Sequence, residues 1–535
     1  MSRIVFDYAR PVVESDPARN DVACFVGLAR ATGSALPPAI QDWLQAHGWT
    51  DGPYARPIGP PFTDIPLPIE GYATFTSLFD PGGSPLSYGT DYLATAVRSF
   101  FAQGGRRCYV VRMGDPVCPH DDVPQNGTTG KALKLAGLMP SDLYAVDDRR
   151  SWHGVGHLGG LPDVSFLALP DLPVLSASGP TAAAGLVPAP PPNPAQFVAC
   201  TPSAVIAPPL PLYVLPAPRL TPGDFAGWGQ SVQSVLGYLT QNNIRNIQFV
   251  AAFPLPRDPD AAGAVEDPSS AALAQDIHNV IAQQMVENIP AGSNGPPPAE
   301  PGLSTAFLQL TYPWLVTTGS DVLNESLEPP DGALVGMLAR NALTRGAFMD
   351  ATKIVPSEIS DLSPYLPAQE MQVPTTPLAW GDNSWKPLIV RLSLFGFTPA
   401  GLRLLSDVTA YPGEAYRPAR VHRLVSVISR AAQQLGERLV FQQNGPAVWR
   451  IVENSLGQLM TQLWQMNALD GATVQDAFSV RCDASTMTQN DLDNGRLLAQ
   501  VTFAAAATIE LIRVTLAIET SGASSQGIAI MAEAS

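Results

Sequence analysis

Two histidines come closest to a pattern that could bind a metal ion. His153 and His157 lie four residues apart, separated by Gly-Val-Gly, and this spacing occurs among paired imidazole ligands. The two rings converge on one ion only when a helix presents both on one face, and the intervening glycines disfavour that helix. The run Cys118-Pro-His120-Asp121-Asp122 also has ligand residue types, but it has no partner set. We interpret both runs as loop residues and predict no metal site and no cofactor.

The stretch from Asn126 to Ala132, Asn-Gly-Thr-Thr-Gly-Lys-Ala, is similar to a phosphate-binding loop. Gln125 stands where that pattern has its first glycine, and Ala132 lacks the hydroxyl that would hold magnesium. A clear preceding strand is missing as well. The chain has no Gly-x-Ser-x-Gly motif, so a serine hydrolase has no obvious nucleophile. We therefore predict no catalytic residue. A hydrolase that uses His153 or His157 remains an alternative from another functional class.

The composition describes a long, acidic chain with few charges. Its 535 residues predict about three or four domains. Charged residues are 15% of the chain, against the usual ~25%, and such a surface suits burial by neighbouring subunits. The net charge is −16, from 31 Lys and Arg against 47 Asp and Glu. This balance argues against nucleic acid as a partner, because nucleic-acid binding needs a basic surface.

The cysteines and the hydropathy indicate where the protein is made. Five cysteines are scattered widely and show no zinc-binding spacing, so we expect reduced, buried thiols in a cytosolic protein. The N-terminus does not resemble a signal peptide, and no apolar run approaches the ~20 residues that span a bilayer. We therefore predict assembly in the cytoplasm without direct membrane insertion.

The first part of the chain predicts a detached strand followed by a strand, a helix and a strand. Residues 4–10 alternate large apolar with small or polar side chains, which is typical of a half-buried strand. Pro11 and a polar run separate it from a buried strand at 22–28. A lone strand must pair with the edge of another sheet. A helical stripe and a strand at 106–112 follow, the stripe being formed by Leu93, Val97, Phe100 and Phe101.

The middle of the chain alternates strands with helices, which predicts an α/β layer. We expect strands at 164–169, 247–253 and 305–311, and helices around 232–239 and 273–286. Two proline-rich breaks, at 177–222 and 290–301, are interpreted as extended, stiff loops.

The last part predicts two amphipathic helices and a long strand. The first helix has an apolar stripe from Val421 to Leu435, and four arginines lie on its other faces. Pro446 lies at an early position of the second helix, where its missing N–H costs nothing. A strand follows at 508–520, then a flexible linker at 521–527 and a short strand at 528–531.

This order of elements closely resembles the C-terminal domain of tail sheath proteins, the contractile sleeves of phage tails and bacterial contractile injection systems. The resemblance includes the runs 471–483 and 486–495. The helix–strand unit at 92–112 resembles the N-terminal unit of that family. The segments Tyr312-Pro-Trp314-Leu, 329–336 and 345–348 are similar to its central domain. One departure is the N-terminus, where many family members have a Pro-Gly-Val-Tyr-type arm and this chain has 4–13 instead.

The resemblance implies an α/β fold with a sheath-type core. This core includes a subtilisin-like α/β middle domain, an α+β C-terminal domain and extended terminal strand arms. The expected divisions are an N-terminal arm at 1–20, the N-terminal part of the core at 21–113, a variable loop-rich segment at 114–163, the subtilisin-like domain at 164–390 with its insertion at 177–222, the C-terminal domain at 391–520 and a flexible tail at 521–535.

The function that the resemblance implies is structural. The expected subunit polymerises as stacked hexameric rings around an inner tube and contracts to drive the tube through a target envelope. Its expected partners are further copies of itself, an inner tube protein, and baseplate and tail-terminator proteins. A baseplate or other tail component with a sheath-like fold is the alternative.

Two groups of residues would carry this assembly. The first comprises strands that pair with neighbouring subunits, with the side chains Ile4, Phe6, Tyr8, Ile512, Val514, Leu516, Ile528 and Ile530. The sequence leaves open which of the two C-terminal strands is donated. The second group is a set of helix arginines that would meet the inner tube, namely Arg417, Arg420, Arg423 and Arg430.

Overall fold

The computed structural model describes most of the chain. The described residues are 19–50, 61–80, 90–125, 127–141, 143–145, 148–178, 216–256, 305–372, 388–411, 415–439, 442, 444–493, 496–506, 511–519 and 531–534. The strand predicted at 4–10, the helix predicted at 273–286 and the strand predicted at 528–531 lie outside them, apart from Met531.

An eight-stranded sheet forms the centre of the larger body. Its order is β14-β13-β10-β8-β6-β1-β5-β3, and the six strands from β13 to β5 are parallel. The antiparallel strands β14 and β3 close the two edges. The bounds are β1 (Ala23–Leu28), β3 (Pro66–Ile69), β5 (Cys108–Gly114), β6 (Phe166–Ala168), β8 (Gln248–Ala252), β10 (Leu308–Tyr312), β13 (Ser393–Thr398) and β14 (Gly401–Leu404).

The central strands are short apolar runs because helices cover both faces of the sheet. Every residue of β1, β6, β8 and β10 is buried, as expected for parallel strands inside an α/β layer. Alternate β1 side chains enter different cores: Phe25 packs with one set of helices, and Cys24 and Val26 pack with the other.

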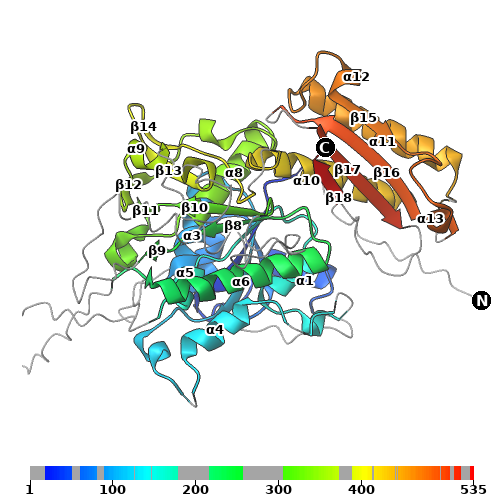
Figure 1. Cartoon of the computed structure of the whole chain (residues 1–535). Coiled ribbons are helices and arrows are strands. Elements are labelled where there is room, and N and C mark those ends of the chain that lie inside the picture. The colour runs from blue at the N-terminus through cyan, green and yellow to red at the C-terminus, as the bar shows by residue number, and fades with distance from the viewer. Residues whose placement is uncertain are drawn as a thin grey trace, which may run out of the picture.

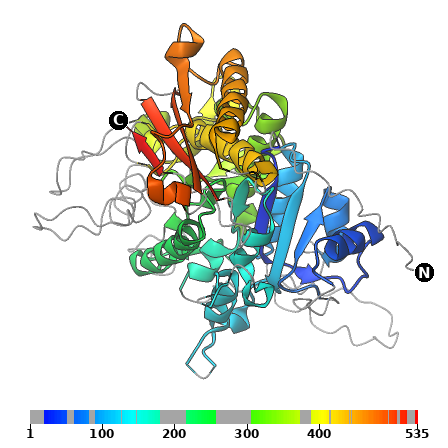
Figure 2. The same cartoon turned by 90° about the vertical axis from the view of Figure 1, so that its right-hand side faces the viewer.

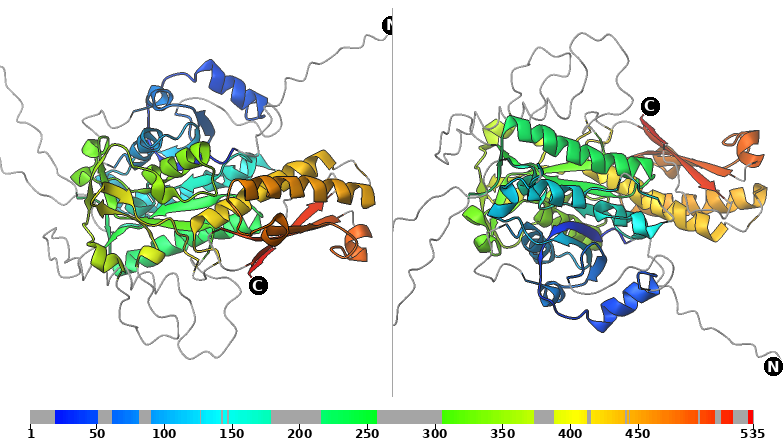
Figure 3. Two further views of the ribbon diagram at one scale, coloured as in Figure 1. Left: turned by 90° about the horizontal axis from the view of Figure 1, so that it is seen from above. Right: turned by 90° about the horizontal axis from the view of Figure 1, so that it is seen from below.

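Within the described residues, helices pack on both faces of the sheet, one set on each (Figures 1 and 3). The first set is α1 (Pro38–Ala46), α2 (Tyr72–Leu78), α3 (Tyr92–Ala102) and α8 (Asp331–Thr344). The second set is α4 (Gly130–Leu138), α5 (Leu172–Ser176) and α6 (Pro222–Gln241). Helices α3 and α8 approach closely at Gly332, where a Cβ atom would lie 2.5 Å from the Cα of Ala96. This contact requires glycine.

The larger body also contains short two-stranded sheets and the short helix α9. The two-stranded pairs are β2 (Arg30–Ala31) with β4 (Phe79–Asp80), β7 (Arg219–Leu220) with β9 (Leu255–Pro256), and β11 (Trp314–Thr317) with β12 (Ile359–Ser363). Helix α9 spans Ala368–Gln372.

A smaller C-terminal body projects from one end of the larger one (Figures 1 and 2). It contains a four-stranded antiparallel sheet in the order β15-β16-β17-β18. Its two long helices bury their apolar stripes against one face of this sheet, which forms a separate core. The bounds are α10 (Ala419–Leu439), α11 (Pro446–Gln465), α12 (Val474–Ala477), β15 (Phe478–Arg481), α13 (Gln489–Asp493), β16 (Arg496–Ala504), β17 (Leu511–Glu519) and β18 (Met531–Ala534).

The structure confirms the strands predicted at 22–28, 106–112, 164–169, 247–253 and 305–311, within a few residues at their ends, and the four long amphipathic helices within the described residues. The domain boundary predicted at 391 is too early. Strands β13 and β14 continue the large sheet, so the C-terminal body begins after Leu404. Cys24, Cys108, Cys118 and Cys482 are unpaired thiols, and all but Cys118 are buried. No helix within the described residues is long and apolar enough to cross a membrane.

Candidate functional site

The residues predicted to join subunits lie partly in the sheet of the C-terminal body. Strand β17 pairs along its whole length with β16, from Leu511 opposite Ala504 to Glu519 opposite Arg496. Ile512, Val514 and Leu516 are buried in the core beneath α10 and α11. The structure therefore corrects the prediction for these three residues: in this chain they are interior residues of its own sheet. Their apolar side chains are already buried in the core of the C-terminal body.

The outer strand of the same sheet is formed by the end of the chain. β18 pairs antiparallel with β17, from Ile512 opposite Ala534 to Thr515 opposite Met531. It lies at the edge of the sheet (Figure 1). Ile528 and Ile530 precede it and lie outside the described residues, as do Ile4, Phe6 and Tyr8. Their pairing with a neighbouring subunit stays a prediction.

Arg423 is an internal residue of the chain. Its guanidinium forms a bidentate ion pair with Asp407, with Nη1–Oδ1 and Nη2–Oδ2 distances of 3.0 and 2.5 Å. It also donates to the carbonyls of Ala347 and Met349. Burial raises the pKa of Asp407, but the adjacent Arg423 more than offsets this and holds that pKa below its usual value. Arg423 is 4% exposed, so the prediction that it contacts a tube is corrected.

Arg430 is also buried, and its partners are backbone carbonyls. It donates to the carbonyls of Arg19 and Asp163 at 3.0 and 3.2 Å and, through Nη2, to that of Val164. These carbonyls lie just before strands β1 and β6, so one side chain binds the backbone at the amino-terminal ends of two strands. Burial lowers the pKa of Arg430 to about 10, which leaves it charged at neutral pH. The predicted tube contact is corrected here too.

Arg417 and Arg420 are only partly buried. The arginine cluster thus divides into two residues that join the bodies of one chain and two that remain accessible. The sequence could not separate them, because the partners of Arg430 precede it by 184 to 411 residues. Asp407, which sequence reasoning missed, lies 16 residues before Arg423 and carried no motif.

The two histidines with metal-like spacing converge on a carboxylate. His153 Nδ1 and His157 Nε2 each lie 2.7 Å from an oxygen of Asp64, and the backbone N–H of Gly154 donates to the same carboxylate. A short 3-10 helix at Gly154–Gly160 positions His157, where a loop was expected. Asp64 has a positive φ of 59°, an uncommon conformation that aims its side chain at both rings.

The loop similar to a phosphate-binding loop is held by ion pairs. Thr129 caps α4 by accepting from the N–H of Ala132. The Lys131 ammonium lies 2.7 Å from Asp122, and Lys134 lies 2.6 Å from Asp121. The lysine that would contact phosphate is therefore already paired and buried. Within the described residues, no group of three or more His, Cys, Asp or Glu side chains could hold a metal ion.

A set of buried carboxyl groups lies at the carboxyl-terminal ends of the parallel strands, opposite the ends that Arg430 binds. Asp171 follows β6 and accepts a 2.7 Å hydrogen bond from the N–H of Leu28 at the end of β1. Asp331 begins α8, and Glu328 accepts from the hydroxyls of Ser99 and Thr317 at 2.6 and 3.0 Å. Burial raises the pKa of Glu328 to about 8 and that of Asp331 to about 7. No sequence motif predicted this group of carboxyls.

The chain matches no protein-family model and no curated protein. It does match solved structures of contractile particles. One is a chain of the cryo-EM structure of the anti-feeding prophage (AFP) baseplate in the contracted state, with 18% identity, 94% of both chains covered and a TM-score of 0.53. A chain of the six-fold symmetrised AFP baseplate gives 17% identity, 94% coverage of both chains and a TM-score of 0.50.

A third match is a chain of the sheath complex of the extracellular contractile injection system PVC, in the contracted state. It is 14% identical, covers 94% of this chain and 93% of that one, and has a TM-score of 0.50. The matches extend over nearly the whole of each chain, and both bodies are included. The protein therefore has the contractile tail sheath fold.

Proposed function

We propose that this chain is a structural subunit of a contractile sheath. Copies of it would polymerise as stacked hexameric rings around an inner tube, and contraction of the sleeve would drive the tube through a target envelope. The observation that carries this proposal is the likeness to a chain of a sheath complex over 94% of this chain and 93% of that one. In this proposal the protein needs no cofactor and has no catalytic centre, and the middle domain, extended past residue 390 to the end of β14, has a subtilisin-like arrangement.

Electron microscopy of the purified full-length protein tests the proposal. We expect long hollow cylinders at high protein concentration, because a head-to-tail contact that does not close generates a helical filament. A protein that stays monodisperse at every concentration, or forms only closed rings, would contradict the sheath role.

The C-terminal sheet is where we propose that neighbouring subunits are joined. β18 is an edge strand, and an edge presents backbone N–H and C=O groups to which another chain can add a strand. Each such backbone hydrogen bond contributes only about 0.5–1.5 kcal/mol net. An arm with several of them would therefore hold subunits together while their bodies change packing.

Arg417 and Arg420 are the two predicted tube contacts that remain partly exposed, and we propose that they face an acidic inner tube. Exposed ion pairs contribute about 0–1 kcal/mol each, which suits a contact that releases during contraction. The double variant Arg417→Glu, Arg420→Glu should form sheaths that no longer enclose the tube in co-assembly. Unchanged co-assembly would remove this assignment.

A baseplate component is the second candidate, because two of the three similar structures described above are baseplate structures. The proposed partners are in either case other tail proteins. A baseplate subunit would form a single ring with partners and would not extend into a cylinder alone, so the same microscopy separates the two roles.

A further inference from the structure

The C-terminal body is fastened to the large sheet by one side of α10. This helix lies across the amino-terminal ends of the parallel strands β1, β6 and β8, where Arg430 binds the carbonyls of Arg19, Asp163 and Val164. Arg423 makes the second fastening, because it donates to the carbonyls of Ala347 and Met349 in the larger body. Its ion-pair partner Asp407 in turn accepts from the N–H of Ala351 and the side-chain amide of Gln309. Both arginines thus have partners. The two bodies also touch through apolar groups, since Ala306 and Phe348 pack against the C-terminal core and the ring of Phe307 lies edge-on to that of His422.

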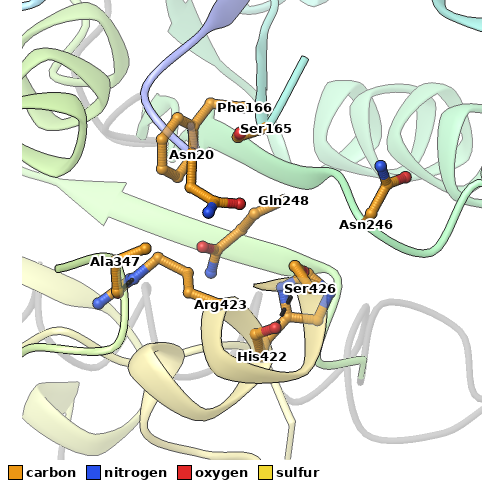
Figure 4. A pocket seen from close by; sticks show the side chains of 9 residues that line it. All are labelled: Asn20, Ser165, Phe166, Asn246, Gln248, Ala347, His422, Arg423 and Ser426. Carbon is orange, nitrogen blue, oxygen red and sulfur yellow. Dashed lines mark hydrogen bonds between the residues drawn. The ribbon is translucent and has the colours of Figure 1, made fainter. Parts of the chain in front are cut away.

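A small cavity lies between these two fastenings. Its volume is about 10 Å³, and most of the residues that line it have polar side chains. Figure 4 shows Asn20 and Ser165 on the strand side, Gln248 in the middle, and His422 and Ser426 on α10. With Ala347, which also lines the cavity, five separate segments of the chain meet at this space.

Gln248 is the central residue of the cavity. It begins β8 and is 1% exposed, yet neither its amide nitrogen nor its amide oxygen has a hydrogen-bond partner among the described residues. The hydroxyl of Ser165, which is 6% exposed, also lacks one there. Buried amides and hydroxyls in native proteins are almost always hydrogen-bonded, because leaving them unpaired forfeits their hydration without return.

The size and charge of the cavity limit what can bind these groups. A water molecule needs about 10–15 Å³ and two to four polar partners, and this cavity meets both conditions. No carboxylate lines it, and the guanidinium of Arg423 does, which disfavours a cation. Any larger polar molecule exceeds its volume.

We propose that a single ordered water molecule is bound between Gln248, Ser165 and helix α10, and that it joins the C-terminal body to the large sheet. The water would donate to the amide oxygen of Gln248 and accept from its amide nitrogen or from a hydroxyl. Such a bridge is nearly as favourable as a direct hydrogen bond. It also lets the two surfaces shift slightly without losing their polar contacts.

The test compares the full-length chain with Gln248→Met, Ser165→Ala and the double variant. Methionine preserves the approximate volume of glutamine and removes its hydrogen-bonding groups. If a water molecule binds Gln248 and Ser165, each single variant removes one of the hydrogen-bond partners of that water. The equilibrium constant for unfolding then rises by about tenfold for Gln248→Met. The double variant should lose less than the sum of the single losses, because both side chains share one water.

Gln309→Met is the matched control. Gln309 is also a fully buried glutamine, on the neighbouring strand β10, but it donates directly to Ser393 and Asp407. This variant must lose stability whether or not a water is present, so it calibrates the size of the effect.

The result that overturns the proposal is equally definite. If Gln248 is simply unpaired, Gln248→Met and Ser165→Ala leave the protein equally stable or make it more stable, because an unsatisfied polar group is removed. If Gln248→Met fails to fold, Ser165→Ala alone decides, since it removes only one oxygen atom. A structure at a resolution that shows waters gives the direct readout: density for a water between the two side chains supports the bridge, and its absence refutes it.

Discussion

Two arginines on one helix show how burial changes the role of a charge. Arg423 and Arg430 have the same residue type and similar spacing as Arg417 and Arg420, and the sequence pattern treats all four alike. The fold places two of them inside the chain, where a guanidinium is stable only if its donors are satisfied. Those donors bind a carboxylate and a set of strand-entry carbonyls. The residues therefore fasten the two bodies of one subunit.

Removing one member of the Arg423–Asp407 pair should be severely destabilising. Arg423→Met leaves Asp407 buried with its charge uncompensated, and we expect a loss of about 3–5 kcal/mol in the free energy of unfolding. Urea unfolding measures this. The double variant Arg423→Met, Asp407→Asn should lose less than the two single variants together, since no charge then remains unpaired.

Arg420→Met on the same helix is the control, because Arg420 is partly exposed. It should change the free energy of unfolding by at most ~0.5 kcal/mol. Strictly additive losses in the double variant would show that the two side chains do not interact.

At the scale of elements, the carboxyl groups at the starts of helices make stability depend on pH. Asp171 precedes α5, and Asp331 begins α8, close to Glu328. Burial raises the pKa of all three, and the charges of Asp91 and Asp331 raise that of Asp171 further. The native protein therefore keeps protons that the unfolded chain, with ordinary carboxyl pKa values of about 4, releases.

The sign of the pH dependence follows from these protons. The native state binds more of these protons than the unfolded chain does. The contribution of the three carboxyl groups to the free energy of unfolding is therefore complete below about pH 4, and it declines as the pH rises toward about 8, the pKa of Glu328. Unfolding curves measured from pH 4 to 9 should show this decline up to about pH 8 and no further loss from these groups above it, and Glu328→Gln should flatten the decline. Glu437→Gln, at an exposed site on α10, is the control and should leave the profile unchanged. A profile in Glu328→Gln identical to that of the parent would contradict the assignment.

The sequence predicted elements far better than contacts. The strands of the large sheet are recognisable because burial on both faces makes them unbroken apolar runs, as in Val22–Leu28. Helices α10 and α11 are recognisable from their apolar stripes. The role of Arg430 and the pairing of His153 and His157 with Asp64 were not predictable. Each depends on residues about 90 or more positions away in the chain, and no local periodicity records such distances.

At the scale of the whole molecule, α10 ties the two bodies together, and each body has its own core. This division fits a subunit whose parts keep their internal packing while the lattice around them changes. The low share of charged residues also agrees with a surface that is largely covered by other copies. Assembly would then depend on the ends of the chain, because the two cores are already complete within the subunit.

Deleting residues 1–13 tests that dependence. The deletion removes Ile4, Phe6 and Tyr8 but no described residue, so we expect a folded monomer with an unchanged circular dichroism spectrum and unfolding midpoint. We expect no cylinders in electron microscopy, because the strand that would add to a neighbour's sheet is gone. A second variant exchanges Ile4, Phe6 and Tyr8 for serine in the full-length chain. It keeps the backbone but removes the apolar side chains that fix the register of a half-buried strand, so it should also fail to assemble. Normal cylinders from the truncated chain would show that the lattice is held by contacts between the bodies themselves.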